Sequence, residues 1–346
     1  MASPYEHTKD ELAQLLGNEP RYRVDQVWHG LWVENQDISE ISTIPKALRA
    51  QLSERLESGL EVVNDIQSDH GSTRKWVFRL HDGSTIETVL MVYDDRVTVC
   101  VSSQAGCAMG CTFCATGQAG FTRHLSTGEV LEQVMYAARA AAPRRLSNVV
   151  FMGMGEPLAN YKVTASAVRR LHDYRGLSAR HLTVSTVGVA PAIERLAREG
   201  MPLTLAVSLH AANDETRNEL VPLNRRYPLA RLREACEFWL ATTSRRLSFE
   251  WALIDGVNDT DQAIEELARY AHGLRAHVNL IPLNPTPGFL VRGSSPERVR
   301  HFRDGLLAHG VNVTVRNTRG RSIDAACGQL ANVTNAKRRS IPVRSS

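Results

Sequence analysis

From residue 97 onward the chain alternates between short apolar segments typical of buried strands and longer segments with helical periodicity. The strand-like runs begin with "VTVCV" at 97–101 and "NVVFMG" at 148–153, and the helical pattern between them starts at Thr127. Further strand-like runs lie at 181–186, 203–210, 247–254, 277–283 and 311–315, with helical patterns at 161–173, 191–200, 229–241, 260–273 and 296–309. This alternation predicts an α/β fold with a parallel sheet, as an open layer or as a barrel.

The first 95 residues follow a different pattern. We expect three short amphipathic helices, at 8–17, 22–34 and 46–56. Two alternating stretches, "TRKWVFRL" and "STIETVLMVY", flank the turn sequence "HDGS" and predict a β-hairpin. The sequence therefore predicts two units: residues 1–95 with the helices and the hairpin, and residues 96–346 with the alternating pattern.

Reactive and polar residues follow several of the strand patterns. Parallel strands end at the same edge of a sheet or barrel, and active sites in such folds lie at that edge. The cysteine-rich loop follows the first strand, "GMGEP" at 153–157 follows the second, and Cys327 follows the last by a loop. The other strand ends carry Ser185, Ser208, Leu209, His210 and Asn284. We expect these groups to meet at one active site.

The segment "CVSSQAGCAMGCTFCATG" holds four of the six cysteines. Cys107, Cys111 and Cys114 have the spacing C-x3-C-x2-C, and Cys100 stands apart from them. Six cysteines are too few to form a disulfide framework in a chain of this length, so a cluster of them indicates a metal site or catalysis. Two metal sites fit the spacing: a zinc site closed by Cys100, or a four-iron cluster that leaves one iron without a protein ligand.

Charge and hydropathy indicate where in the cell the protein works, but they do not indicate its function. The net charge is +4, and no apolar run is long enough to span a bilayer. The N-terminus lacks the basic and apolar order of a signal peptide, so we expect a cytoplasmic protein that is not bound to a membrane. Basic residues gather at 316–321 and in a C-terminal tail at 335–344, where either a solvated face or contact with nucleic acid explains them.

With these motifs in place, the sequence resembles the radical S-adenosylmethionine (SAM) superfamily, whose signature is the same cysteine triplet after the first strand of an alternating β/α domain. The resemblance implies a partial (β/α) barrel of radical SAM type with a small helical accessory domain and a β-hairpin linker. Several motifs taken together are similar to the RlmN/Cfr family, which methylates one adenine of bacterial 23S rRNA. These motifs are "CVSSQAGCAMGCTFCATG", "GMGEPLAN", "LTVSTVG", "AVSLHA", "NLIPLNPTPG" and "TRGRSIDAACGQL".

The family resemblance implies roles for three residues outside the cysteine triplet. Cys327 would accept a methyl group and carry it to the base, forming a covalent bond between protein and RNA. Cys100 would then attack the Cys327 sulfur, closing a disulfide and releasing the methylated base. Glu87 would accept the proton from the adenine carbon. We expect Glu87 at the tip or edge of a strand, partly buried by apolar neighbours that would raise its pKa.

The resemblance also implies cofactors and partners. Cys107, Cys111 and Cys114 would hold one [4Fe-4S] cluster, and two molecules of SAM would be used in each turnover. The SAM contacts would come from Gly155, Glu156, Ser185, Ser208, Leu209, His210 and Asn284. The RNA substrates would be 23S rRNA and an adenine beside the anticodon of some tRNAs, gripped by the helical N-terminal region. The electron donor would be a flavodoxin or ferredoxin, and the enzyme would act as a monomer.

Three other functions remain open at this point. The motifs favour the branch of the family that methylates C2 of adenine, but the spacing of the cysteines fits methylation at C8 equally well. A glycyl-radical activating enzyme shares the triplet but has no need of Cys100 or Cys327. A zinc-stabilised RNA-binding protein without catalysis is the third alternative.

Overall fold

The computed structural model describes residues 3–284, 292–316, 320, 323–325 and 328–330. Its centre is one ten-stranded sheet with the strand order β1-β2-β3-β4-β7-β8-β9-β10-β11-β12. The strands from β4 to β12 are parallel, and β1, β2 and β3 extend the sheet in antiparallel fashion. The strands are β1 (Glu61–Ser68), β2 (Thr73–Arg79), β3 (Thr85–Val92), β4 (Val97–Cys100), β7 (Asn148–Phe151), β8 (Leu182–Thr186), β9 (Thr204–Ser208), β10 (Leu247–Leu253), β11 (His277–Pro282) and β12 (Asn312–Val315).

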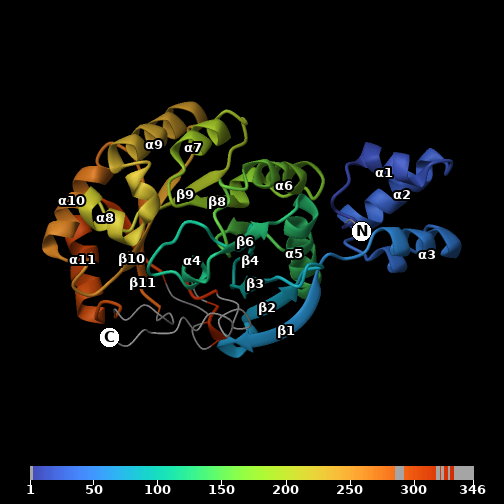
Figure 1. The fold of residues 1–346 in the computed structure, drawn as a ribbon, viewed down its shortest axis with the longest axis horizontal. Helices are drawn as coiled ribbons and strands as arrows, with labels where there is room; N and C mark the ends of the chain where they lie inside the picture. The colour runs from blue at the N-terminus through green and yellow to red at the C-terminus, as the bar shows by residue number, and fades with distance from the viewer. Residues whose placement is uncertain (1–2, 285–291, 317–319, 321–322, 326–327, 331–346) are drawn as a thin grey trace, which may run out of the picture.

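The sheet curves, and helices cover its convex face (Figure 1). Each parallel crossover contributes a helix, as the alternating sequence pattern requires. These helices are α5 (Thr127–Ala140), α6 (Tyr161–Asp173), α7 (Ala190–Ala197), α8 (Asp214–Leu220), α9 (Leu229–Thr243), α10 (Asp261–Ala271) and α11 (Pro296–Ala308). Among the described residues the edge strands β1 and β12 do not pair with each other. The prediction of a partial barrel is therefore confirmed.

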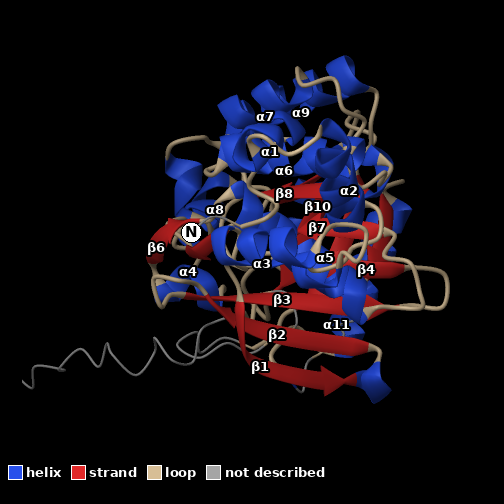
Figure 2. Ribbon diagram, turned by 90° about the vertical axis from the view of Figure 1, so that its right-hand side faces the viewer, coloured by secondary structure: helices blue, strands red, loops and turns tan. Residues whose placement is uncertain are grey.

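The predicted hairpin is also confirmed, with two additions. β2 and β3 pair in antiparallel register, with Val77 opposite Glu87. β3 pairs in turn with β4, so the hairpin continues the main sheet, and β1 adds a further strand outside it (Figure 2). The sequence did not predict β1 because nearly all of its residues are exposed, so it lacks the alternation of apolar and polar residues that marks a half-buried strand.

The N-terminal helices are α1 (Lys9–Leu16), α2 (Arg21–Trp32) and α3 (Lys46–Arg55). An aromatic cluster fastens them to the segment after α6, where Tyr174 meets Trp28 and Trp32 edge-on at centroid distances of 4.8 and 5.3 Å. From α6 itself, Arg170 donates hydrogen bonds to the backbone carbonyls of Tyr5 and Glu6. The predicted helical region is thus packed against the barrel by buried and half-buried aromatic rings and by charge-assisted hydrogen bonds.

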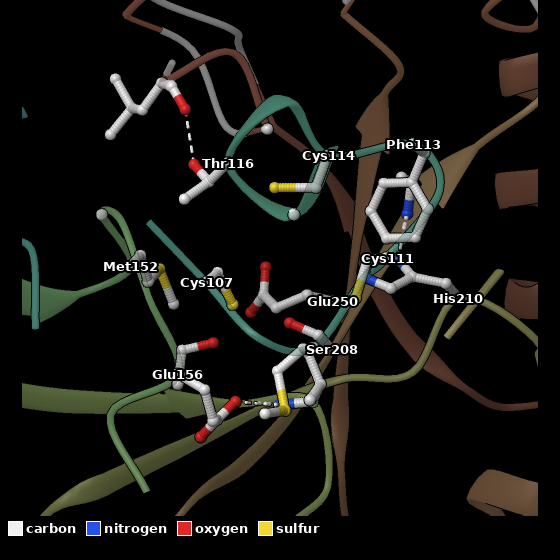
Figure 3. A pocket seen from close by; sticks show the side chains of 18 of the residues that line it. Cys107, Cys111, Phe113, Cys114, Thr116, Met152, Glu156, Ser208, His210 and Glu250 are labelled. Atoms are coloured by element: carbon white, nitrogen blue, oxygen red, sulfur yellow. Dashed lines mark hydrogen bonds between the residues drawn. The ribbon is translucent and has the colours of Figure 1, made fainter. Parts of the chain in front are cut away.

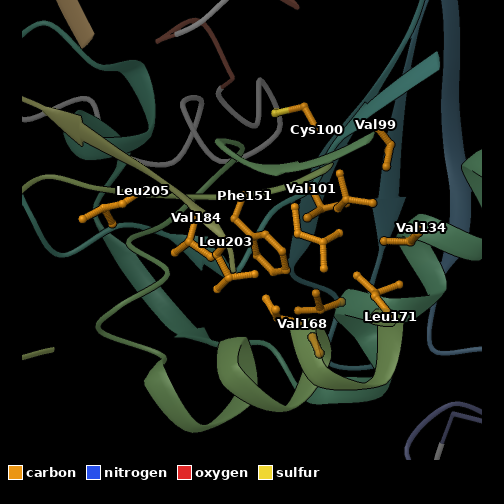
Figure 4. Close-up of a cluster of buried hydrophobic side chains, with 14 of the residues drawn as sticks. Val99, Cys100, Val101, Val134, Phe151, Val168, Leu171, Val184, Leu203 and Leu205 are labelled. Carbon is orange, nitrogen blue, oxygen red and sulfur yellow. The ribbon is translucent and has the colours of Figure 1, made fainter. Parts of the chain in front are cut away.

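The part of the main apolar core shown in Figure 4 lies between the sheet and the helices α5 and α6, and the same core continues under other helices. Val99 and Val101 of the β4 segment are 0% and 1% exposed and belong to this core. Because successive side chains of a strand point to opposite faces, Cys100 between them points to the concave face of the sheet. Within the described part of the chain, no helix is both long enough and apolar enough to cross a bilayer.

Candidate active site

One cavity lies at the carboxyl ends of the parallel strands, and most of the expected cofactor residues line it (Figure 3). It brings together segments that are far apart in the sequence, as expected for the edge where parallel strands end. The expected residues that line it are Cys107, Cys111, Cys114, Gly155, Glu156, Ser185, Ser208, His210 and Asn284. Leu209 is the exception: its side chain is fully buried and does not line the cavity.

The three cysteines come from the loop that leads into the short helix α4 (Ala115–Ala119), and they surround one space (Figure 3). At the start of this loop the backbone runs close to the residue that follows α4: the Cys107 N–H donates a hydrogen bond to the Gly120 carbonyl at 2.8 Å. Gly106 beside it has φ +76°, and a Cβ there would lie 2.0 Å from the same carbonyl oxygen. Only glycine fits at this position.

Soft thiol donors lining one cavity fit an iron–sulfur cluster. Burial raises the pKa of Cys107 to about 12 and raises that of Cys111 as well, so these thiols need a cationic partner to ionise near neutral pH. The irons of a cluster would provide this charge. In the described residues, no three His, Cys, Asp or Glu side chains converge to hold a single metal ion.

The "GMGEP" turn brings the Gly155 backbone and the Glu156 carboxylate to the cavity that the three cysteines line. Gly155 has φ +101°, and a Cβ there would lie 2.5 Å from the Cβ of Gln104, so the close approach requires glycine. The Glu156 carboxylate accepts hydrogen bonds from the N–H groups of Val187 and Leu158 at 2.8 and 2.9 Å. Burial nevertheless raises the pKa of Glu156 to about 7. An ammonium placed beside this carboxylate would stabilise its charged form.

His210 is locked in place at the end of β9. Its Nδ1 accepts a hydrogen bond from the Ala252 N–H at 3.0 Å, and its ring meets Phe113 of the cysteine loop at 4.5 Å. Burial, together with the nearby Arg217, lowers the pKa of His210 to about 3. The ring is therefore neutral at physiological pH, and its Nε2 carries the proton.

Arg217 of α8 ties two strand ends of the cavity together. It is 1% exposed, and its guanidinium donates to the carbonyls of Leu209 at 3.0 Å and Val187 at 2.7 Å. A third hydrogen bond goes to the Asn224 side chain at 2.7 Å. The fork of guanidinium donors thus fixes the segments that follow β8 and β9 relative to each other.

Cys100 lines a second cavity on the concave face of the sheet. Both cavities share lining residues, so they adjoin; the shared residues are Met152, Ile281, Asn284, Arg316 and Leu330. Cys100 is buried, with 9% of its surface exposed. The structure therefore separates Cys100 from the triplet and places it beside the same space.

Glu87 differs from its expected setting. It lies in the middle of β3, a strand with neighbours on both sides, and not at a tip or edge. Its side chain is only 2% exposed, where partial burial was expected, and it forms an ion pair with Lys75 at 3.2 Å. The flanking apolar residues bury Glu87 fully because a central strand packs on both faces.

Cys327 lies outside the described residues, but the residues that directly follow it contact the site. Gly328 and Leu330 line the first cavity. The Gly328 carbonyl accepts a hydrogen bond from the Ala115 N–H at 2.9 Å, and the Leu330 carbonyl accepts one from the Thr116 hydroxyl. The segment after Cys327 is thus attached to the helix that directly follows the three cysteines.

Two charged residues of the site were missed by the sequence analysis. Glu250 lines the first cavity at 4% exposure and forms an ion pair with Arg316 at 3.2 Å. A lone carboxylate inside the apolar run "SFEWAL" was the available signal, since buried acids are rare without a partner. Arg316 was expected on a solvated or RNA-binding surface; instead it points into the junction of the two cavities. The rest of the basic clusters at 316–321 and 335–344, apart from Gly320, lies outside the described residues.

Comparisons with known proteins agree with this site. The radical SAM superfamily model matches residues 101–271. A solved radical SAM methyltransferase from Sphaerobacter thermophilus is 51% identical with a TM-score of 0.93, over 95% of this chain and 99% of that one. The fold and the cysteine-lined cavity therefore define a radical SAM enzyme.

Sequence relatives narrow the class further. A Parafrankia sp. protein described as "Probable dual-specificity RNA methyltransferase RlmN" is 53% identical over 90% of this chain and 86% of its own length. A Thermobifida fusca protein of the same description is 50% identical over 93% of this chain and 92% of its own length. The chain belongs to the RlmN family of dual-specificity RNA methyltransferases, and it is a radical SAM RNA methyltransferase. Its family implies a [4Fe-4S] cluster, SAM and an RNA substrate.

Proposed function

We propose that this enzyme methylates C2 of one adenine in 23S rRNA and of an adenine beside the anticodon of some tRNAs. The supporting observation is the pair of adjoining cavities, with three cysteines in one, Cys100 in the other and Gly328, next to Cys327, at the first. C2 lies between two ring nitrogens and has no lone pair to attack a methyl sulfonium. Radical chemistry meets this difficulty, and the cysteine-lined cavity has the donors to support it.

The cavity residues would hold the cofactors. Cys107, Cys111 and Cys114 would ligate the [4Fe-4S] cluster, which with SAM supplies a methyl group and a 5′-deoxyadenosyl radical. Gly155 and Glu156 would receive the SAM amino group by backbone approach and by the buried carboxylate. The remaining SAM contacts would come from Ser185, Ser208, Leu209, His210 and Asn284, with Leu209 limited to its backbone because its side chain is fully buried.

Cys327 and Cys100, two cysteines outside the triplet, would divide the steps of methyl transfer between them. Cys327 would carry the methyl group as S-methylcysteine and then link to the base through its methylene carbon. The Cys100 thiolate would attack the Cys327 sulfur, so that a sulfur–sulfur bond forms and the sulfur–carbon bond breaks. Glu87 would accept the proton that leaves C2. The disulfide between Cys100 and Cys327 is proposed as a transient product of turnover.

An RNA substrate would place two demands on the protein. The target adenine would have to leave its stack to reach this cavity, and the N-terminal helices would grip the RNA by its shape. A flavodoxin or ferredoxin would donate the electrons, two SAM molecules would be used per turnover, and the enzyme would act as a cytoplasmic monomer.

Alanine variants of the two cysteines test this division of labour. Cys327→Ala lacks the carrier, so no bond to RNA forms and the base stays unmodified. Cys100→Ala can still form the bond but has no thiolate to release it. We therefore expect the Cys100 variant, expressed with its RNA, to migrate as a conjugate that survives denaturation, with mass spectrometry placing the link on Cys327.

Cys236→Ala is the matched control, because this cysteine is buried in α9 away from both cavities. It should methylate RNA and form no conjugate. If both site variants remain free of RNA, or if the link maps to another residue, the proposed roles are wrong. Chromatography of the product nucleoside decides between methylation at C2 and the alternative at C8.

A further inference from the structure

Lys75 is a buried cation that the proposed chemistry does not use. It lies on β2 with 6% of its surface exposed. Its ammonium is 3.2 Å from the Glu87 carboxylate and donates a hydrogen bond to the Asp324 carbonyl, also at 3.2 Å. A buried ammonium is costly unless it is paired and hydrogen-bonded. Lys75 therefore joins two elements: the strand of the proposed proton acceptor and the segment that leads to Cys327.

A second contact holds the same segment from the same side. The Gly320 N–H donates to the Asp69 carboxylate at 2.9 Å, in the turn between β1 and β2. The Ala325 N–H in turn donates to the Gly320 carbonyl at 2.9 Å. The antiparallel part of the sheet thus holds the approach to Cys327 at two points, and at one of them Lys75 contacts Glu87 as well.

We propose that Lys75 is a positioning residue for methyl transfer. Its ammonium holds the Glu87 carboxylate and the Asp324 backbone in one arrangement, so that the proton acceptor and the methyl-carrying segment face the base together. This inference rests on the proposed function, since it assigns Lys75 a task only if Cys327 and Glu87 have theirs. Lys75 itself touches neither cofactor nor base.

The test compares Lys75→Met with Arg79→Met, both in the Cys100→Ala enzyme reconstituted with its cluster. Arg79 lies on the same strand and pairs with Glu61 at the surface, so its variant also removes one cation and one ion pair. We expect Lys75→Met to form the protein–RNA conjugate roughly tenfold more slowly or worse, the effect of losing a hydrogen bond to a charged group. The KM for SAM and the SAM cleavage without RNA should stay unchanged.

Two further measurements separate positioning from general damage. Lys75→Arg keeps the cation and its donors, so it should recover much of the rate. Amide hydrogen exchange at Gly320 and Ala325 should become faster in Lys75→Met and stay unchanged in Arg79→Met. If Lys75→Met does not fold, Lys75→Gln is measured in the same way, because its amide still reaches toward the Asp324 carbonyl without a charge.

Each outcome has one meaning. If the Lys75 variants form the conjugate at the rate of the Cys100→Ala parent, with unchanged hydrogen exchange, the inference is overturned and the proposed function stands. Equal losses in Lys75→Met and Arg79→Met also overturn it, because they show only general destabilisation. If the parent Cys100→Ala enzyme itself forms no conjugate, the proposed function has failed, and the role of Lys75 fails with it.

Discussion

At the scale of single residues, burial controls the charge of His210. Its pKa is lowered to about 3 in the folded protein, whereas a histidine in an unfolded chain titrates near about 6.5. Between these two values the unfolded chain binds a proton that the folded chain does not. The contribution of His210 to stability is therefore complete above about pH 6.5 and declines as the pH falls below it.

His210→Asn provides the test. Asn can accept the Ala252 N–H bond and tolerates the left-handed backbone at this position, where φ is 59°, but it does not titrate. We expect the free energy of unfolding of wild type to fall relative to the variant by about 1.4 kcal/mol per pH unit below pH 6.5. Denaturant unfolding between pH 7.5 and 5, at equal cluster content, measures the difference. Parallel curves for the two proteins would contradict the prediction.

Residues of the site differ in how well the sequence predicted them. The cysteine triplet and the strand-end residues Ser185, Ser208 and His210 were predicted because local spacing and strand position specify them. Lys75 and Arg316 were not, because their roles depend on partners far along the chain: Asp324 for the first and Glu250 for the second. A motif describes residues that are close in sequence. These contacts join residues far apart in sequence, which meet only when the sheet curves.

At the scale of secondary-structure elements, Arg217 links α8 to the ends of β8 and β9. Arg217→Met would leave the Val187 carbonyl without this donor, at about 1–3 kcal/mol for an unsatisfied acceptor, whereas the Leu209 carbonyl keeps its hydrogen bond from the Ala211 N–H. We expect the free energy of unfolding of Arg217→Met to fall by that amount. The loosened strand ends should weaken SAM binding by a similar free energy, which corresponds to a roughly tenfold lower affinity. Calorimetry with the reconstituted enzyme measures the affinity.

Arg195→Met is the matched control for this prediction, because Arg195 is an exposed arginine on the neighbouring helix α7. Its variant should bind SAM as wild type does. If Arg217→Met loses stability but keeps full SAM affinity, Arg217 supports the fold alone and does not set the strand ends for the cofactor.

Elements of the fold were predicted where their residues face a core. The parallel strands and their covering helices follow from hydrophobic periodicity, and the structure confirms them. The sequence analysis missed α8 and the two-stranded sheet of β5 (Gln104–Gly106) and β6 (Phe121–His124). Both strands are too short for a periodic pattern, and their pairing depends on the close backbone approach at Gly106.

At the scale of the whole molecule, the N-terminal helices stand to one side of the barrel (Figure 1). They carry the exposed basic residues Arg21 and Lys46, which under the proposed function would meet RNA phosphates. We expect the double variant Arg21→Glu, Lys46→Glu to bind RNA more weakly. The slope of log affinity against log salt should decrease by about 0.7–0.9 for each phosphate that the variant no longer neutralises.

Arg300→Glu is the control for charge alone, since Arg300 is exposed on α11, on the opposite side of the barrel (Figure 1). Its salt dependence should match that of wild type, and SAM cleavage without RNA should be normal in all of these variants. Equal slopes for the N-terminal variant and wild type would show that the RNA is gripped elsewhere.

The attachment of the C-terminal segment to the β1–β2 turn also concerns the order in which the chain is made. Asp69 and Lys75 leave the ribosome 251 and 249 residues before their partners Gly320 and Asp324. The expected cofactor residues all lie before residue 317, but Gly328 and Leu330, which also line the first cavity, are made later, as are the contacts around Cys327. On the proposed role of Cys327, a nascent chain that stops before this segment cannot carry a methyl group, so RNA modification begins only after the segment has been translated.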